Sequence, residues 1–144
     1  MDTYYRPTRA EISLDALSRN IAAFRRALAP GTKLMASVKA NAYGHGAVEI
    51  ARESVSAGAD MLGVAFLDEA VQLRRGGIEA PILVLGYVPP EGFSVARELD
   101  ISVAMFREDA LEAAARPGTR PLRVHVKVDT GMGRLGVLPE EAVR

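Results

Sequence analysis

A lysine and an arginine each follow an apolar run of the sequence, and both lie in segments rich in glycine. Lys39 comes directly after residues 33–38 (KLMASV), and Arg134 lies in residues 129–136 (DTGMGRLG). A lysine amine whose pKa is lowered by burial or by a neighbouring cation can form an imine with an aldehyde cofactor. An arginine is a planar, permanently charged fork that suits an anion. Position alone does not distinguish this Lys39 from a solvated lysine that ends a strand.

Short apolar runs rich in β-branched residues recur between helical patterns, and they predict the elements that would position these groups. The runs are residues 33–38, 61–64, 82–85, 101–104 and 122–128. Their starts are 28, 21, 19 and 21 residues apart, which leaves room for a strand, two short loops and a helix of about ten residues. Strands that alternate with helices predict a parallel sheet, and the even spacing favours a (β/α) barrel of the TIM type over a doubly wound sheet. Because a closed barrel has eight strands, residues 1–144 are expected to form an incomplete α/β barrel of roughly five.

The helical segments carry their own start and stop residues. An amphipathic stripe between Leu14 and Leu28 predicts a first helix, with Ser13 as its N-cap and Pro30 and Gly31 as its stop. Later helices are expected to begin at acidic residues that suit the positive end of the helix dipole, at 68–69, 90–91 and 108–109. Two of them should stop at 76–77 and 117–118, and residues 9–13 (RAEIS) are a candidate for one further strand.

The composition excludes several classes of function. Eighteen basic residues balance eighteen acidic ones, so neither nucleic acid nor an anionic membrane is an expected partner. There is no cysteine, which excludes a disulfide framework and a thiolate metal site. Residues 1–7 lack the apolar region of a secretory signal, and no apolar run is long enough to span a bilayer. We therefore expect a cytoplasmic protein whose partner is a small molecule or another protein.

Two other patterns in the sequence give weaker evidence of a binding site. The glycine spacing of residues 131–136 fits a dinucleotide-binding fingerprint, but Pro139 interrupts the helix that should follow. His45 and His125 are far apart and lack a third ligand, so no metal site is expected. His45 is expected to order its loop, and His125 to pack or hydrogen-bond within a strand.

Two segments together resemble alanine racemases. Residues 38–41 (VKAN) are similar to the cofactor-lysine segment both of that family and of the barrel-type amino-acid decarboxylases. The continuation 42–46 (AYGHG) and the second segment 129–136 resemble alanine racemases, and this disfavours a decarboxylase. The resemblance runs from about Arg6 to the last residue and covers less than half of a usual family member.

The resemblance implies pyridoxal 5'-phosphate as the cofactor and assigns roles to four residues. Lys39 would hold it as an imine and then act as acid and base on one face of the substrate carbon. Tyr43 would hydrogen-bond the cofactor phosphate, and Arg134 would approach the cofactor's phenolic oxygen and the substrate carboxylate. Lys127 matches a position that some alanine racemases carboxylate, which would let it orient Arg134. The simpler alternative is a strand lysine paired with Asp129 or a glutamate.

The implied activity is the interconversion of L-alanine and D-alanine, which supplies D-alanine for the bacterial cell wall. The family is homodimeric, and its second base is a tyrosine from a later domain of the partner subunit. The rest of the barrel and the C-terminal β domain are expected to lie outside these 144 residues, so this chain alone should be inactive. A barrel that binds the cofactor without turnover, and a truncated product that only self-associates, remain alternatives.

Overall fold

Five parallel strands in sequential order form the centre of the protein. The computed structural model describes residues 5, 7–118 and 120–142, so most of the N-terminal segment 1–7 lies outside the described residues. Each strand pairs in parallel with the next along the chain, as predicted: β1 (Met35–Ser37), β2 (Met61–Val64), β3 (Ile82–Val84), β4 (Ile101–Met105) and β5 (Val124–Val126). The carboxyl ends of all five strands therefore lie at the same edge of the sheet.

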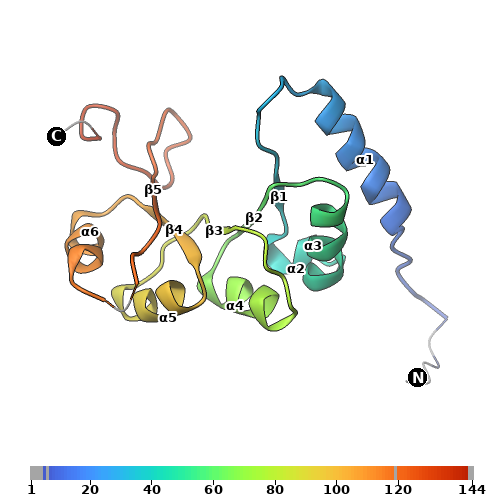
Figure 1. Cartoon of the computed structure of the whole chain (residues 1–144), viewed down its shortest axis with the longest axis horizontal. Coiled ribbons are helices and arrows are strands. Elements are labelled where there is room, and N and C mark those ends of the chain that lie inside the picture. Colours follow the sequence, from blue (N-terminus) through green and yellow to red (C-terminus); the bar gives the residue numbers. More distant parts are fainter. Residues whose placement is uncertain (1–4, 6, 119, 143–144) are drawn as a thin grey trace.

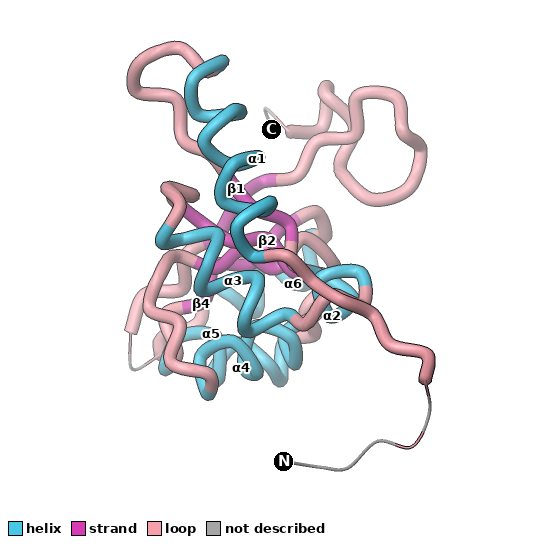
Figure 2. Tube along the Cα trace, turned by 90° about the vertical axis from the view of Figure 1, so that its right-hand side faces the viewer, coloured by secondary structure: helices cyan, strands magenta, loops and turns pink. Residues whose placement is uncertain are grey.

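Helices α3 (Ala47–Ser56), α4 (Leu67–Arg75), α5 (Phe93–Glu98) and α6 (Glu108–Ala115) follow the strands and cover one side of the sheet (Figure 1). Helix α1 (Leu14–Ala27) precedes β1. A tight turn, α2 (Lys39–Tyr43), follows β1, and a short 3-10 turn, η1 (Pro90–Gly92), precedes α5. The predicted N-cap of α1 is confirmed, because the Ser13 hydroxyl accepts a hydrogen bond from the Ala16 N–H at 3.2 Å. Helix α1 lies beside α3 on the outside of the molecule (Figure 2), and the Ser18 hydroxyl donates to the Glu53 carboxylate there.

Three expected strand segments differ from the sequence prediction. Residues 9–13 form no strand and lead into α1 in an irregular conformation, since nothing in the sheet lies beside them. The first and last strands are shorter than the apolar runs that predicted them. Both are edge strands, with a single neighbour each.

The core lies between the inner strands and helices α3 to α6. Leu62, Val64, Val84 and Val103 are completely buried, whereas Val126 on β5 is 63% exposed. A sheet that is buried at its centre and open at its last strand is an incomplete (β/α) barrel, because closure would pair that edge. None of the helices in the described residues is both long and apolar enough to cross a membrane.

Candidate active site

Lys39 lies at the carboxyl end of β1, where the fold places functional groups. The preceding residue, Val38, is 1% exposed and its N–H donates to the Gly63 carbonyl on β2 at 2.9 Å. This anchors the backbone just before the lysine. The Lys39 side chain is half-buried, and its Nζ lies 6.0 Å from the centroid of the exposed Tyr43 ring. The structure therefore brings these two predicted residues together.

The segment that joins Lys39 to Tyr43 is a left-handed turn. Residues Ala40, Asn41, Ala42 and Tyr43 all have φ between 51° and 54°. This conformation costs a non-glycine residue roughly 1–2 kcal/mol. Four consecutive residues therefore adopt a backbone that their own preferences oppose, so their surroundings have to hold it.

Several hydrogen bonds hold the turn in place. The Ala42 N–H donates to the Val38 carbonyl at 2.9 Å. The Asn41 side chain accepts from the Ala47 N–H at 2.8 Å, which links the turn to the start of α3. The His45 ring Nδ1 lies 2.8 Å from the Ala42 carbonyl oxygen, which confirms the expectation that His45 orders its loop.

Glu69 completes the anchoring of this turn, a role that its place in the sequence does not predict. Its Oε1 accepts from the Ala40 N–H at 2.6 Å, and its Oε2 accepts from the N–H groups of Ala65 at 2.6 Å and Phe66 at 3.1 Å. The sequence identified Glu69 only as an acid at the start of a helix. A capping box would have been a clue, but Phe66 occupies the N-cap position in place of serine or threonine.

The segment that carries Arg134 folds around the carboxylate of Asp129. One oxygen of Asp129 accepts from the N–H groups of Gly131 at 2.9 Å and Gly133 at 3.1 Å, and the other accepts from the Arg134 N–H at 3.2 Å. These backbone donors, Gly131 first, lower the pKa of Asp129 below its ordinary value of 3.8. The Arg134 side chain is exposed, and β1 and β5 are opposite edges of the sheet, so Lys39 and Arg134 are separated by three strands.

A glycine closes this loop. The chain returns to β5 through hydrogen bonds from the Val137 N–H to the Lys127 carbonyl at 2.9 Å and from the Asp129 N–H to the Val137 carbonyl at 2.8 Å. Gly136 has φ +141°, and a Cβ atom there would lie 2.5 Å from the Asp129 nitrogen. Glycine is therefore required where the two backbone segments meet.

Lys127 forms no ion pair with Asp129, so this alternative to carboxylation is not observed among the described residues. Its Nζ donates instead to the Leu85 carbonyl, just beyond β3, at 3.0 Å. The carboxylate oxygens of Asp129 are engaged by backbone N–H groups of its own loop, and Lys127 takes part in none of the ion pairs between described residues. His125, on β5, is exposed, and its expected packing is not observed.

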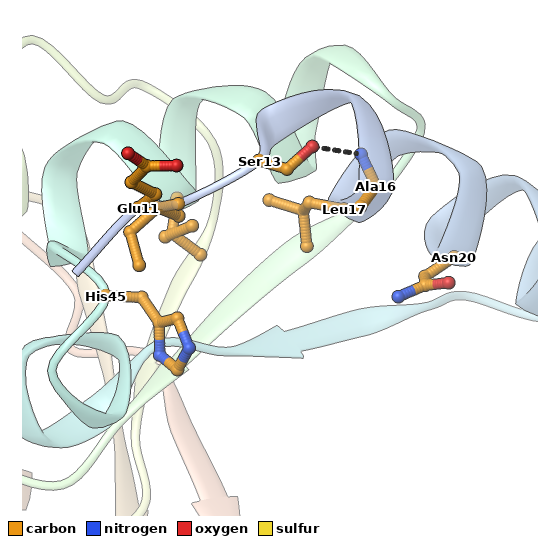
Figure 3. A pocket seen from close by; sticks show the side chains of 8 residues that line it. Glu11, Ser13, Ala16, Leu17, Asn20 and His45 are labelled. Carbon is orange, nitrogen blue, oxygen red and sulfur yellow. Dashed lines mark hydrogen bonds between the residues drawn. The ribbon is translucent and has the colours of Figure 1, made fainter.

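A separate pocket lies behind the left-handed turn. His45 and Ile50 line it together with residues from the segment that enters α1 and from α1 itself: Glu11, Ile12, Ser13, Ala16, Leu17 and Asn20 (Figure 3). The His45 ring thus contacts the pocket while its Nδ1 holds the turn. In the part of the chain that the structure describes, no three histidine, aspartate or glutamate residues are grouped to hold a metal ion.

Comparison with known proteins decides the family. The profile of the family described as alanine racemase, N-terminal domain, matches residues 12–144. The chain belongs to the alanine racemase family. The alanine racemase of Geobacillus kaustophilus (strain HTA426) is 52% identical over all of this chain, and alanine racemase 1 of Bacillus subtilis (strain 168) is 49% identical over 98% of it.

Solved alanine racemases share the fold as well. The enzyme from Bacillus anthracis with bound L-Ala-P superimposes with a TM-score of 0.91 at 40% identity over 97% of this chain. The enzyme from E. faecalis superimposes with the same TM-score at 44% identity over 96% of the chain. The chain spans 38% of the Geobacillus relative and 37% of the Bacillus anthracis structure. Family membership thus rests on the N-terminal part of the alanine racemase barrel.

Proposed function

We propose that residues 1–144 are the N-terminal part of a barrel that binds pyridoxal 5'-phosphate, and that this barrel serves the interconversion of L-alanine and D-alanine. The observation that carries the proposal is the placement of Lys39 beside Tyr43 at the carboxyl end of β1, held by a turn with the residues AYGHG. Catalytic residues of parallel barrels lie at this end of the strands. A cytoplasmic homodimer that supplies D-alanine for the cell wall belongs to the same proposal.

The residues present suit such a cofactor. It carries an aldehyde, a phenolic oxygen and a phosphate, and the chain offers the half-buried Lys39 amine, the exposed Tyr43 hydroxyl and the exposed Arg134 guanidinium. Lys39 would hold the cofactor covalently, Tyr43 would donate to the phosphate, and Arg134 would neutralise the phenolic oxygen and bind the substrate carboxylate. The bound cofactor would act as the electron sink when the substrate loses its α-proton.

Lys39 would also move that proton. Its Nζ would accept the α-proton from one face of the substrate and return it to the same face. Inversion requires a second group on the opposite face, which we expect from a tyrosine of the partner subunit. We therefore propose that the 144-residue chain alone binds the cofactor but does not racemise alanine.

We also propose that Lys127 is carboxylated. Its Nζ is half-buried and contacts a neutral carbonyl rather than a carboxylate. Loss of one proton to give the neutral amine, followed by addition of CO2 and release of a second proton, would convert this cation into an anionic carbamate able to hold Arg134, which follows on the same loop. Incorporation of labelled bicarbonate into Lys127, detected by carbon-13 NMR, would support this assignment, and its absence would refute it.

Hydrogen exchange at the substrate tests the proposed function directly. Alanine incubated in heavy water with the chain and pyridoxal 5'-phosphate should take up deuterium at Cα in one enantiomer without inversion, and Lys39→Ala should abolish the uptake above the level of free cofactor. Release of ethylamine and CO2 would indicate a decarboxylase instead. Cofactor binding without deuterium uptake would indicate a barrel that binds without turnover.

A further inference from the structure

We propose that Glu69 is a positioning residue for Lys39. Its carboxylate holds the first residue of the left-handed turn and so sets the direction in which the lysine side chain leaves β1. The inference rests on the proposed function in one respect: the labelling experiment below assumes that Lys39 binds the cofactor.

The two oxygens of Glu69 divide between two loops. Oε1 accepts from Ala40, which follows Lys39, and Oε2 accepts from Ala65 and Phe66, which follow β2. The side chain comes from the first turn of α4. A single carboxylate therefore ties the carboxyl ends of the first two strands together. Hydrogen bonds to a charged acceptor are stronger than those between neutral groups.

The bond to Ala40 acts on the backbone of Lys39 itself. The Ala40 N–H belongs to the peptide plane that joins the two residues, so fixing this N–H fixes the ψ angle of Lys39. The residues that follow have positive φ angles from Ala40 to Tyr43, a conformation that an unrestrained alanine would leave. Without the carboxylate, the turn would lose the anchor nearest the lysine.

A glutamine cannot replace this carboxylate. Glu69→Gln keeps one acceptor oxygen but turns an NH2 group toward the backbone donors of one of the two loops. The neighbouring Asp68 provides a matched control, because it is an exposed acid in the same first turn of α4. Asp68→Asn removes the same charge from the helix end without touching the Lys39 turn.

Amide exchange measures the anchor without any cofactor. In Glu69→Gln, the Ala40 N–H should exchange about tenfold faster with deuterium, which corresponds to the loss of one hydrogen bond to a charged group. It should keep its wild-type rate in Asp68→Asn. Glu69→Asp keeps the charge but is one methylene too short, so it should resemble Glu69→Gln. It serves as the second variant if Glu69→Gln does not fold. An unchanged Ala40 rate in a folded Glu69 variant would overturn the proposal.

Covalent labelling measures the consequence at Lys39. Folded protein is incubated with pyridoxal 5'-phosphate and borohydride, and the adducts on Lys39 and on the exposed Lys33, at the opposite end of β1, are compared by peptide mass mapping. The Lys39 to Lys33 ratio should fall several-fold in Glu69→Gln and stay constant in Asp68→Asn. If Glu69 only capped α4, unfolding would occur at lower temperature with an unchanged ratio, which would overturn the positioning role. A wild-type chain that forms no Lys39 adduct would refute the proposed function, and the Ala40 exchange rate would still decide whether Glu69 holds the turn.

Discussion

The turn after Lys39 shows how the surroundings of a few residues can override their own preferences. Ala40, Asn41 and Ala42 favour right-handed backbone in isolation, yet all three have φ above 50° here. Their conformation is set by partners such as Val38 and Glu69. Strain of this kind is found where a precise arrangement serves function, and here it lies directly beside the proposed cofactor lysine.

Glycine at position 40 should relieve part of this strain. We expect Ala40→Gly to raise the free energy of unfolding by about 1 kcal/mol, because glycine adopts positive φ without steric cost. The matched control is Ala23→Gly, at an exposed position inside α1. There the same change should lower the free energy of unfolding by about 1 kcal/mol. Urea unfolding of both variants checks the opposite signs, and a loss of stability in Ala40→Gly would contradict the account.

The lowered pKa of Asp129 predicts that the loop of residues 129–136, which carries Arg134 and is called the arginine loop below, depends on pH. Hydrogen bonds from its loop, that of the Gly131 N–H first, lower the pKa of Asp129 below 3.8 in the folded state. A carboxylate with a lowered folded pKa contributes stability that is fully present above its unfolded pKa and is lost as pH falls through the folded value. The amide NMR shifts of Gly131 and Gly133 should therefore stay constant above about pH 4 and change only in more acidic solution. A transition near neutral pH would be inconsistent with this role.

At the scale of the elements, local pattern predicted most of the sheet. The apolar runs that became β2, β3 and β4 were correctly placed because strands buried on both faces have continuous apolar sequence. The ends of β1 and β5 and the irregular residues 9–13 were not predicted. Whether a backbone segment forms a strand depends on a neighbour, and the neighbours come from elsewhere in the chain.

The same limit applies to the site. Lys39, Tyr43 and Arg134 are predicted from their motifs, and their roles stay predictions. Glu69 was not predicted because its partner Ala40 lies 29 residues earlier. A pairing of Lys127 with Asp129, one of the alternatives left open, does not form, because the Asp129 oxygens accept from its own loop. Side-chain to backbone contacts of this kind depend on the fold and leave no periodic pattern in the sequence.

The arginine loop offers a test at the scale of one element. Gly131 and Gly136 both have positive φ, but only at Gly136 would a Cβ atom meet other backbone, whereas none lies within 4 Å of Gly131. Gly131→Ala should cost about 1 kcal/mol for its φ alone. Gly136→Ala should cost at least about 1 kcal/mol more because the loop has to shift. Equal losses in urea unfolding would show that the close approach at Gly136 does not matter.

At the scale of the whole molecule, the open edge at β5 dominates the behaviour expected in solution. Val124 and Val126 are 41% and 63% exposed on a strand whose outer side carries no partner among the described residues. Exposed strand edges with apolar side chains associate with other chains. We therefore expect folded material of this chain to be oligomeric.

A lysine on the edge strand should reduce this association. Val126→Lys places a charge on β5, which disfavours edge-to-edge pairing, and should shift light-scattering mass toward the monomer. Leu111→Lys is the control, because Leu111 is 52% exposed on helix α6 and not on a strand, and it should leave the mass unchanged. If the wild-type chain were a monomer by light scattering, this would contradict the expectation that the open edge of β5 drives association.

The central claim is that Lys39 is the residue that binds the cofactor, and covalent mapping tests it most directly. The chain has three lysines, at positions 33, 39 and 127, so a borohydride-reduced adduct can be assigned without ambiguity. Folded chain treated with pyridoxal 5'-phosphate should show an imine absorbance that borohydride removes, with the adduct on Lys39 and little on Lys33 or Lys127. An adduct spread evenly over the three lysines, or none in folded protein, would contradict the claim.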